Sequence, residues 1–516
     1  MPKLTRRDFL KLIGVGTVTA AAGGALWSRL RSSNTAPQGT PFPSTQPTLS
    51  GTPDLDVALR AAPDEVAIFP GKPTQVWRFQ GQVVEGSKEA LQVIPNTYLG
   101  PIFHLKRGQR VRVRFSHDLP ETSIVHWHGL HVPEKDDGHP RFVIPKGQTY
   151  TYDFTVRDRA GTYWYHPHPH GRTGPEVYRG MAGLFIVSDD EEQALGLPSG
   201  EYDIPLVLQD RRFDSNNQLV YLQNGRMEQM TGFLGNTMLV NGQPNFVLPV
   251  GTRPYRLRLL NGSNARIYKL AWEDGTPLTV IGTDGGLLEK PIQKAFVTLA
   301  PAQRVELWVD FSQVPVGTRR RMLSLTHGAP GGQSTFPVFT VEVTQKAKSD
   351  ARLPDRLSTI TPYREQDAAN AASPRTFTLA MSMGRGWTIN GRTFQMTAVA
   401  PDEVVRLGDL EVWSFINQPA GGGMMGGGMS IPHPMHVHDL QFQILRRTVD
   451  SRWRALWDTL APGFVDAGWH DTVLVMPGER VDILLKFQDF EGLFLYHCHN
   501  LEHEDMGMMR NYLVKA

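Results

Sequence analysis

One spaced pattern of residues occurs twice in this 516-residue chain. The first copy runs from Gly147-Gln148-Thr149-Tyr150 to Gly161 and His166, and the second runs from Gly478-Glu479-Arg480-Val481 to Gly492 and His497. In both copies the first glycine stands 19 residues before the histidine and the second glycine stands five before it. Self-similarity at a fixed spacing indicates duplicated structural units.

The residues inside these units are typical of β-strands. Short β-branched and aromatic runs at 110–115, 150–156, 255–260, 305–311 and 481–487 are separated by Gly, Pro, Asn and Asp. This pattern favours antiparallel β-sandwiches. A weaker middle copy lies at 251–262 and 301–305. We therefore predict three sandwich domains, at 54–190, 200–346 and 373–516, with a polar connection over 346–373.

The N-terminal residues 1–53 read as an export signal followed by a linker. Thr5-Arg6-Arg7-Asp8-Phe9-Leu10-Lys11 precedes an apolar run of small residues that ends near Trp27 and is too short for a stable membrane span. The paired arginines resemble the twin-arginine export signal, which implies Tat export machinery as a partner and a periplasmic or extracellular location. Residues 32–53 have the Ser/Thr/Pro/Gly composition of a linker.

Charge and cysteine content exclude two other kinds of protein. The 53 basic and 51 acidic residues give a net charge of +2, and there is no dense basic block that would bind nucleic acid. Cys498 is the single cysteine, so no intramolecular disulfide can form. It stands between two histidines, which favours a metal ligand over an inert core thiol.

Ten of the 17 histidines fall in four clusters. Residues two apart on a strand project to the same face, so the two imidazoles of a His-x-His pair can reach one metal site. Four such clusters, divided between the first and last copies of a repeat, indicate a metal centre. They are His126-Trp127-His128, His166-Pro167-His168, His433-Pro434-Met435-His436-Val437-His438, and His497-Cys498-His499 followed by His503 and Met508.

The types of donor favour copper. Two histidines, one cysteine and a more distant methionine form the ligand set of a blue copper site, and His433, His503, Cys498 and Met508 supply it. Zinc competes for any three or four histidines, but it is redox-inert and gives no role to the paired arrangement of the other eight. The single histidine of the middle copy, His327, lies outside these clusters, so we expect that copy to be free of metal.

The four clusters resemble those of the multicopper oxidase family over nearly the whole chain after residue 53. The resemblance implies an all-β protein of three cupredoxin-like Greek-key β-sandwich domains with four copper ions. It implies that His433, Cys498, His503 and Met508 bind a type 1 copper and that His126 and His436 bind a type 2 copper. The type 3 pair would be bound by His128, His166, His168, His438, His497 and His499.

Such enzymes take single electrons from a donor and reduce O₂ to water. Cys498 and its histidine neighbours point to opposite faces of a strand, so we expect them to link two centres on the order of 10 Å apart. O₂ reduction consumes protons, so we expect acids beside the inner cluster. Asp137 and Glu504 match the acidic positions of the family and are the expected catalytic residues.

The donor is left open by the sequence. Laccase-like oxidation of phenols and aromatic amines is the leading hypothesis, and Cu(I) oxidation for copper tolerance is the alternative. The Gly-rich run at 421–429 carries Met424, Met425 and Met429, whose thioethers suit Cu(I) but could instead pack over the site. A non-enzymatic cell-division protein or a copper-storage protein with this fold is an alternative of another class.

Overall fold

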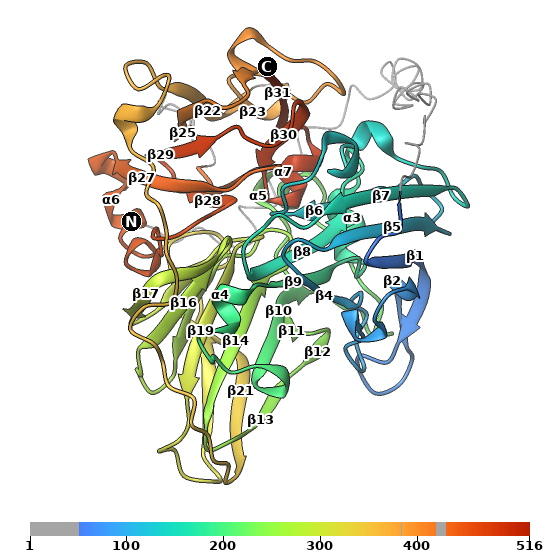
Figure 1. The fold of residues 1–516 in the computed structure, drawn as a ribbon, viewed down its shortest axis with the longest axis vertical. Coiled ribbons are helices and arrows are strands. Elements are labelled where there is room, and N and C mark those ends of the chain that lie inside the picture. Colours follow the sequence, from blue (N-terminus) through green and yellow to red (C-terminus); the bar gives the residue numbers. More distant parts are fainter. Residues whose placement is uncertain (1–50, 383, 419–429) are drawn as a thin grey trace, which may run out of the picture. The chain divides into compact units, whose positions relative to one another are not determined.

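The computed structural model describes residues 51–382, 384–418 and 430–516. The expected export signal and the methionines at 424–429 lie outside these residues. The described part of the chain forms six β-sheets, and each sheet takes its strands from one of three consecutive stretches (Figure 1).

The first stretch forms two sheets with the strand orders β2-β1-β5-β7 and β3-β4-β9-β8-β6. Residues from both sheets, among them Val57, Trp127 and Phe185, share one buried core. The strands are β1 (Leu55–Val66), β2 (Thr74–Glu85), β3 (Leu91–Gln92), β4 (Ile102–Lys106), β5 (Arg110–His117), β6 (Val125–His128), β7 (Thr149–Thr155), β8 (Gly161–Pro167) and β9 (Gly183–Ser188).

The second stretch forms sheets with the orders β12-β11-β10-β14-β19-β16-β17 and β13-β21-β20-β15-β18 around a second core. The strands are β10 (Asp203–Arg211), β11 (Thr237–Val240), β12 (Gln243–Pro244), β13 (Val247–Gly251), β14 (Pro254–Asn261), β15 (Tyr268–Trp272), β16 (Leu278–Thr283), β17 (Gly286–Lys294), β18 (Val297–Leu299), β19 (Arg304–Asp310), β20 (Arg319–Ser324) and β21 (Phe336–Gln345).

The third stretch forms sheets with the orders β23-β22-β25-β29-β27 and β24-β31-β30-β26-β28 around a third core. The strands are β22 (Arg375–Ser382), β23 (Gly386–Ile389), β24 (Val404–Arg406), β25 (Leu410–Asn417), β26 (His433–Val437), β27 (Phe442–Val449), β28 (Thr472–Val475), β29 (Glu479–Lys486), β30 (Gly492–Cys498) and β31 (Met509–Lys515).

The three sandwiches repeat one topology. The orders β2-β1-β5-β7, β11-β10-β14-β19 and β23-β22-β25-β29 correspond strand by strand, and each has its parallel pair in the same place (β1 with β5, β10 with β14, β22 with β25). The second sheets correspond in the same way, so β6, β15 and β26 are equivalent, as are β8, β20 and β30. The predicted all-β repeat is therefore confirmed. The domain boundaries at 54–190, 200–346 and 373–516 stay a prediction, although all strands of each sandwich lie inside them.

Strand β5 illustrates how the sequence sets these faces. Val111, Val113 and Phe115 alternate with arginines and point into the first core, where they are fully buried. Arg110 and Arg112 point to the other face and donate to Asp153 on the neighbouring strand β7. Alternation with a period of two thus decides which side chains enter the core and which pair across the sheet.

Helices are short in the described part of the chain. They are α3 (Thr173–Tyr178), α4 (Asp190–Gln193), α5 (Arg226–Thr231), α6 (Arg454–Trp457) and α7 (Leu501–Asp505). None of the described helices has the length and apolar character needed to span a membrane. Helix α7, at the end of β30, carries His503, and α5 of the middle sandwich lies against it through the hydrogen bonds described below.

Candidate metal centres

Four strands carry the histidine clusters to the place where the first and last sandwiches meet (Figure 1). Antiparallel pairing of β6 with β8 sets His126 opposite His166, and pairing of β26 with β30 sets His436 opposite His497. The second residue of several His-x-His pairs lies just beyond its strand end, as His168 does after β8. The imidazoles at the strand ends of the first sandwich therefore face the imidazoles at the strand ends of the last sandwich.

Eight of the predicted ligands form one buried group. Two contacts between Nε2 atoms cross between the sandwiches, His126 to His436 at 3.4 Å and His168 to His497 at 3.3 Å, and a third joins His438 to His497 at 3.1 Å within the last sandwich. The rings are at most 1% exposed. The group consists of His126, His128, His166, His168, His436, His438, His497 and His499.

The group contains separable sets of three donors. Ligand atoms of His168, His438 and His497 lie within 4.8 Å of one another. On the other side, the ring of His499 lies 5.0 Å from that of His128 and 5.3 Å from that of His166. Two three-histidine sets thus flank the contact between His126 and His436.

Oxygen acceptors fix the orientation of several of these rings. The Nδ1–H groups of His126 and His436 donate to the backbone carbonyls of Asp137 (2.7 Å) and Asp471 (2.8 Å). His438 Nδ1 donates to Asp137 Oδ2 at 2.9 Å. Because the proton then sits on Nδ1, each Nε2 keeps its lone pair for a metal.

The other predicted ligands form a second buried group on the opposite face of β30. Cys498 Sγ lies 3.4 Å from His433 Nδ1 and 3.6 Å from His503 Nδ1, and the two Nδ1 atoms are 3.2 Å apart. Met508 is fully buried, and its backbone bonds to Cys498 and His503. The two predicted histidines and the cysteine are thus assembled in one place, and Met508 is joined to them through its backbone.

Strand β30 connects the two groups. Cys498 belongs to the second group, while His497 and His499 on either side belong to the first. In an extended strand the neighbours of a residue point to the opposite face. The two groups are therefore joined covalently through the backbone between Cys498 and each of its neighbours, His497 and His499, as the His-Cys-His sequence predicts.

The two predicted acids lie at the edge of the first group. Asp137 Oδ1 is 3.3 Å from His126 Nδ1, and its Oδ2 accepts from His438. Glu504 Oε2 is 3.2 Å from His497 Nδ1, and its Oε1 is 3.6 Å from His168 Nε2. Each carboxyl group therefore touches two histidines, and both are almost fully buried.

Burial favours the neutral form of eight of these histidines. It lowers the pKa of His503 to about 3, and burial together with neighbouring histidines holds the pKa of seven others well below the ordinary value. Burial likewise raises the pKa of the Cys498 thiol, so a bound cation is needed to form the thiolate. The seven are His128, His166, His168, His433, His436, His438 and His499.

Both groups fit metal ions. His166 Nε2 and both ring nitrogens of His499 are buried and have no hydrogen-bond partner among the described residues. A buried polar atom without a partner costs about 1–3 kcal/mol, which a metal bond would offset. Neutral imidazoles and one thiolate are donors that suit copper.

Among the side chains around the groups that sequence reasoning missed are Asp471, Arg304 and Trp387. Asp471 Oδ1 lies 3.0 Å from His128 Nε2, and Asp471 is paired with Arg304 of the middle sandwich. The Trp387 ring lies 4.7 Å from that of His433 and 5.0 Å from that of His503. None of the three lies in a histidine cluster, so only the packing of the sandwiches identifies them.

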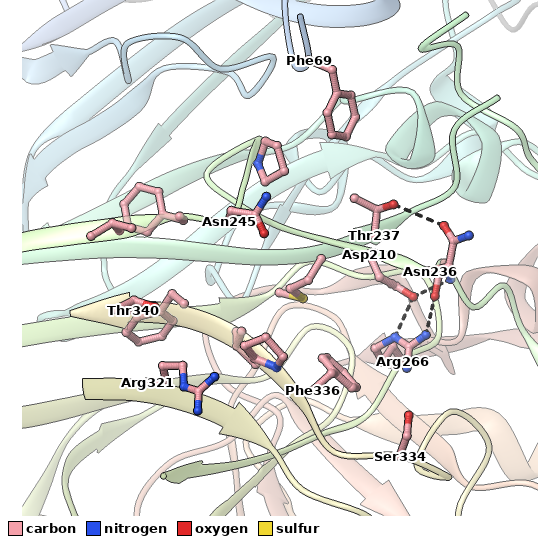
Figure 2. A pocket seen from close by; sticks show the side chains of 18 of the residues that line it. Phe69, Asp210, Asn236, Thr237, Asn245, Arg266, Arg321, Ser334, Phe336 and Thr340 are labelled. Carbon is pink, nitrogen blue, oxygen red and sulfur yellow. Dashed lines mark hydrogen bonds and ion pairs between the residues drawn. The ribbon is translucent and has the colours of Figure 1, made fainter. Parts of the chain in front are cut away.

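The remaining described histidines have other surroundings. His170 is exposed beside Phe394, and His327 Nε2 bonds to the Ile267 carbonyl. A cavity of about 660 Å³ on the middle sandwich, lined by Phe69, Asn245 and Phe336 among others, contains none of the predicted site residues (Figure 2).

Comparison with known proteins agrees with this geometry. Two family models described as multicopper oxidase match residues 76–192 and 368–516. A laccase of Bacillus stratosphericus is 30% identical over 85% of this chain and 90% of its own length. The crystal structure of the McoA multicopper oxidase from Aquifex aeolicus superimposes with a TM-score of 0.76 at 35% identity, covering 90% of this chain and 97% of that one.

The chain belongs to the multicopper oxidase family, and it is a laccase-like, copper-dependent oxidoreductase. The cell division protein FtsP of Photorhabdus laumondii is also similar, with 30% identity over 98% of this chain and 97% of its own length. Membership of the multicopper oxidase family implies that this chain binds copper. The assignment of each ligand rests on the geometry of the site.

Proposed function

We propose that this protein couples the one-electron oxidation of a reducing substrate to the four-electron reduction of O₂ to water. The observation that carries the proposal is the position of Cys498. Its sulfur belongs to one donor group, and the histidines on either side belong to the other. A storage protein would not need two donor groups joined through a single residue.

We propose that the donors would bind four copper ions. The type 1 ion would be held by His433, Cys498, His503 and Met508, and the type 2 ion by His126 and His436, whose Nε2 atoms are 3.4 Å apart. The type 3 pair would be held by two sets of three, His168 with His438 and His497, and His128 with His166 and His499.

Bound copper would supply the electron transfer, in which four electrons and four protons convert one O₂ into two water molecules. The chain's part is to hold the donors, to exclude bulk water and to deliver protons. Asp137 and Glu504 would deliver the protons. Each carboxyl group lies at the edge of the cluster and contacts one histidine of the first sandwich and one of the last.

Phenols and aromatic amines are the proposed donors, in keeping with the laccases to which the chain is similar. The test is oxygen uptake with a phenolic donor, followed together with the blue band at about 600 nm. We expect bleaching of the band by the donor under argon and its return with O₂. A colourless protein, or one whose band does not respond to the donor, would contradict the proposal.

Cu(I) is a second candidate donor because methionines surround the type 1 group. Met230, Met381 and Met506 pack against the core that contains Cys498 and Met508. Met227, also on α5, is 61% exposed. The Met230 carbonyl accepts hydrogen bonds from both His503 Nε2 (3.0 Å) and Trp387 Nε1 (2.9 Å), so α5 covers the outer edge of His503. A cover of this kind favours a small ion over a bulky phenol.

Leucine keeps the bulk of methionine but removes the thioether, so a triple Met227→Leu, Met381→Leu, Met506→Leu variant separates the two donors. If Cu(I) is a substrate, its KM should rise about tenfold while phenol oxidation stays unchanged. Met396→Leu, an exposed methionine outside this set, is the matched control. Equal effects on both donors would remove Cu(I) from the proposal.

A non-enzymatic role like that suggested by the name of FtsP is the remaining alternative. Twelve buried donor side chains converge in the two groups, and a structural protein gives no reason to keep them. Oxygen uptake by the copper-loaded chain distinguishes the two classes.

We further propose export to the periplasm or the medium through the Arg6-Arg7 signal, on the pattern of residues 5–27. Replacing both arginines by lysine should leave the protein inside the cell. Unchanged export of that variant would contradict a twin-arginine route.

A further inference from the structure

Arg304, the first residue of β19 in the middle sandwich, reaches the histidine group of the other two sandwiches. Its Nη1 donates to Asp471 Oδ1 at 2.8 Å and its Nη2 donates to Asp471 Oδ2. Asp471 directly precedes β28 of the last sandwich, and both side chains are fully buried. The pair is therefore a two-pronged buried ion pair between sandwiches.

Every N–H of the Arg304 guanidinium has an acceptor. Besides the two bonds to Asp471, Nε donates to Thr162 O (2.8 Å), Nη1 to Ala302 O (3.0 Å) and Nη2 to Asp284 O (3.0 Å). Thr162 lies on β8, the strand that carries His166. The guanidinium thus bonds to all three sandwiches at once, and a lysine, with three donors on a flexible stem, could not reproduce this arrangement.

The held carboxylate of Asp471 acts on one histidine of the first sandwich. Asp471 Oδ1 lies 3.0 Å from His128 Nε2. A carboxylate can only accept, so Nε2 carries the proton and the lone pair is on Nδ1. His128 Nδ1 has no hydrogen-bond partner among the described residues. His128 is therefore turned the opposite way from His126, His436 and His438, which donate through Nδ1.

We propose that Arg304 and Asp471 are positioning residues that fix the tautomer and the ring orientation of His128, so that Nδ1 is presented to the metal cluster. The inference rests on the proposed function, because it needs His128 to be a copper ligand. It gives the middle sandwich, for which we expect no metal ion of its own, a part in building the cluster. Asp471 of the last sandwich orients His128 of the first sandwich, and Arg304 of the middle sandwich holds Asp471 in place.

The test uses Arg304→Lys and Asp471→Asn, with Arg266→Lys as the matched control. Arg266 is also a buried arginine of the middle sandwich, and its Nε donates to Asp210 at 2.7 Å beside the cavity of Figure 2, away from the histidine groups. The readouts are copper ions per chain, copper affinity measured by competition with a chelator, and the intensity of the blue band. The blue band reports the fold of the last sandwich independently of His128.

Loss of a partner that orients a metal ligand lowers metal affinity about 10- to 100-fold. We expect both variants to show this loss for the copper bound by the eight-histidine group, with an unchanged blue band, while Arg266→Lys keeps full copper. Wild-type copper affinity in both variants would overturn the inference. Loss of the blue band in both would do so as well, because the pair would then serve general stability. Failure of the wild-type chain to bind about four copper ions would instead contradict the proposed function itself.

Discussion

The middle and last sandwiches have the same strand order but carry different side chains where the strands pair. In the last sandwich β26 and β30 place His436 opposite His497. The equivalent strands of the middle sandwich, β15 and β20, place Ala271 opposite Leu323 at the corresponding position. The backbone pairing is the same, so the fold does not depend on the imidazoles.

This difference between the middle and last sandwiches shows which features of the duplicated unit are constant. Each sandwich keeps its own apolar core, and the polar residues at strand ends are free to differ. The outer copies use these positions for histidine, while the middle copy supplies Arg304 and the helix α5 that meets His503. If this is correct, changes to the histidines of the outer copies should remove metal chemistry, and a change to His327, the histidine of the middle copy, should leave it.

The largest effect is expected from Cys498→Ser in the last sandwich. Serine fits the space but lacks the soft thiolate that gives a blue copper site its charge-transfer band. The variant should fold, lose the band at about 600 nm and lose donor oxidation altogether. The measurement is the absorption spectrum with an activity assay, and an intense blue band in this variant would remove Cys498 from the type 1 site.

A smaller effect is expected from Glu504→Gln and Asp137→Asn, which replace a titratable carboxyl group by an amide of similar shape. Positioned proton donors contribute about 10²- to 10⁴-fold to a rate, so O₂ reduction should slow by at least about 100-fold while copper loading stays complete. Glu176→Gln is the control, since this buried carboxyl bonds to Ser123 instead of a histidine. Full turnover in the first two variants would show that protons arrive by another route.

Acid should destabilise the metal-free protein mainly through its outer sandwiches. Burial lowers the pKa of His503 in the last sandwich to about 3 and the pKa of His139 in the first sandwich to about 4. Histidines with a depressed folded pKa take up protons on unfolding below pH about 6.5, so stability falls as the pH drops from there towards 4. Each such proton costs about 1.4 kcal/mol per pH unit.

Thermal unfolding of the copper-free and copper-loaded chains between pH 7 and pH 4 measures this effect. The melting temperature of the copper-free chain should fall with pH. That of the copper-loaded chain should be higher but fall at least as steeply, because copper binding releases protons and copper affinity therefore weakens as the pH drops. A melting temperature that rises on acidification would contradict buried neutral histidines.

The smallest effect is expected from His327→Gln in the middle sandwich. His327 is the histidine of the middle sandwich and lies three residues after the end of β20, and its Nε2 bonds to the Ile267 carbonyl. Copper content and turnover should remain at the wild-type level, whereas His499→Gln should lose copper. Loss of copper from the His327 variant would mean that the middle sandwich is not metal-free.

Much of the site could be predicted because it depends on local geometry. Alternation along a strand fixes which histidines share a face, so the His-x-His spacing alone predicted two groups separated by Cys498. The carboxyl groups Asp137 and Glu504 were predicted from the resemblance to the family's acidic positions, and the structure puts both in contact with the histidines.

The rest could not be predicted because it depends on how the sandwiches meet. Arg304 and Asp471 are 167 residues apart, and neither belongs to a motif. The cover over His503 comes from Met230, on a short helix of the middle sandwich with no metal-binding pattern. Such contacts depend on side-chain packing between sandwiches, which hydrophobic periodicity does not encode.

Copper and oxygen stoichiometry of the loaded chain tests the central claim most directly, that two joined donor groups form a blue site and a trinuclear site. The account predicts about four copper ions per chain, a blue band, and one O₂ reduced to water for about every four electrons taken from the donor. A chain that binds a single copper, or that releases hydrogen peroxide as its main product, would contradict it.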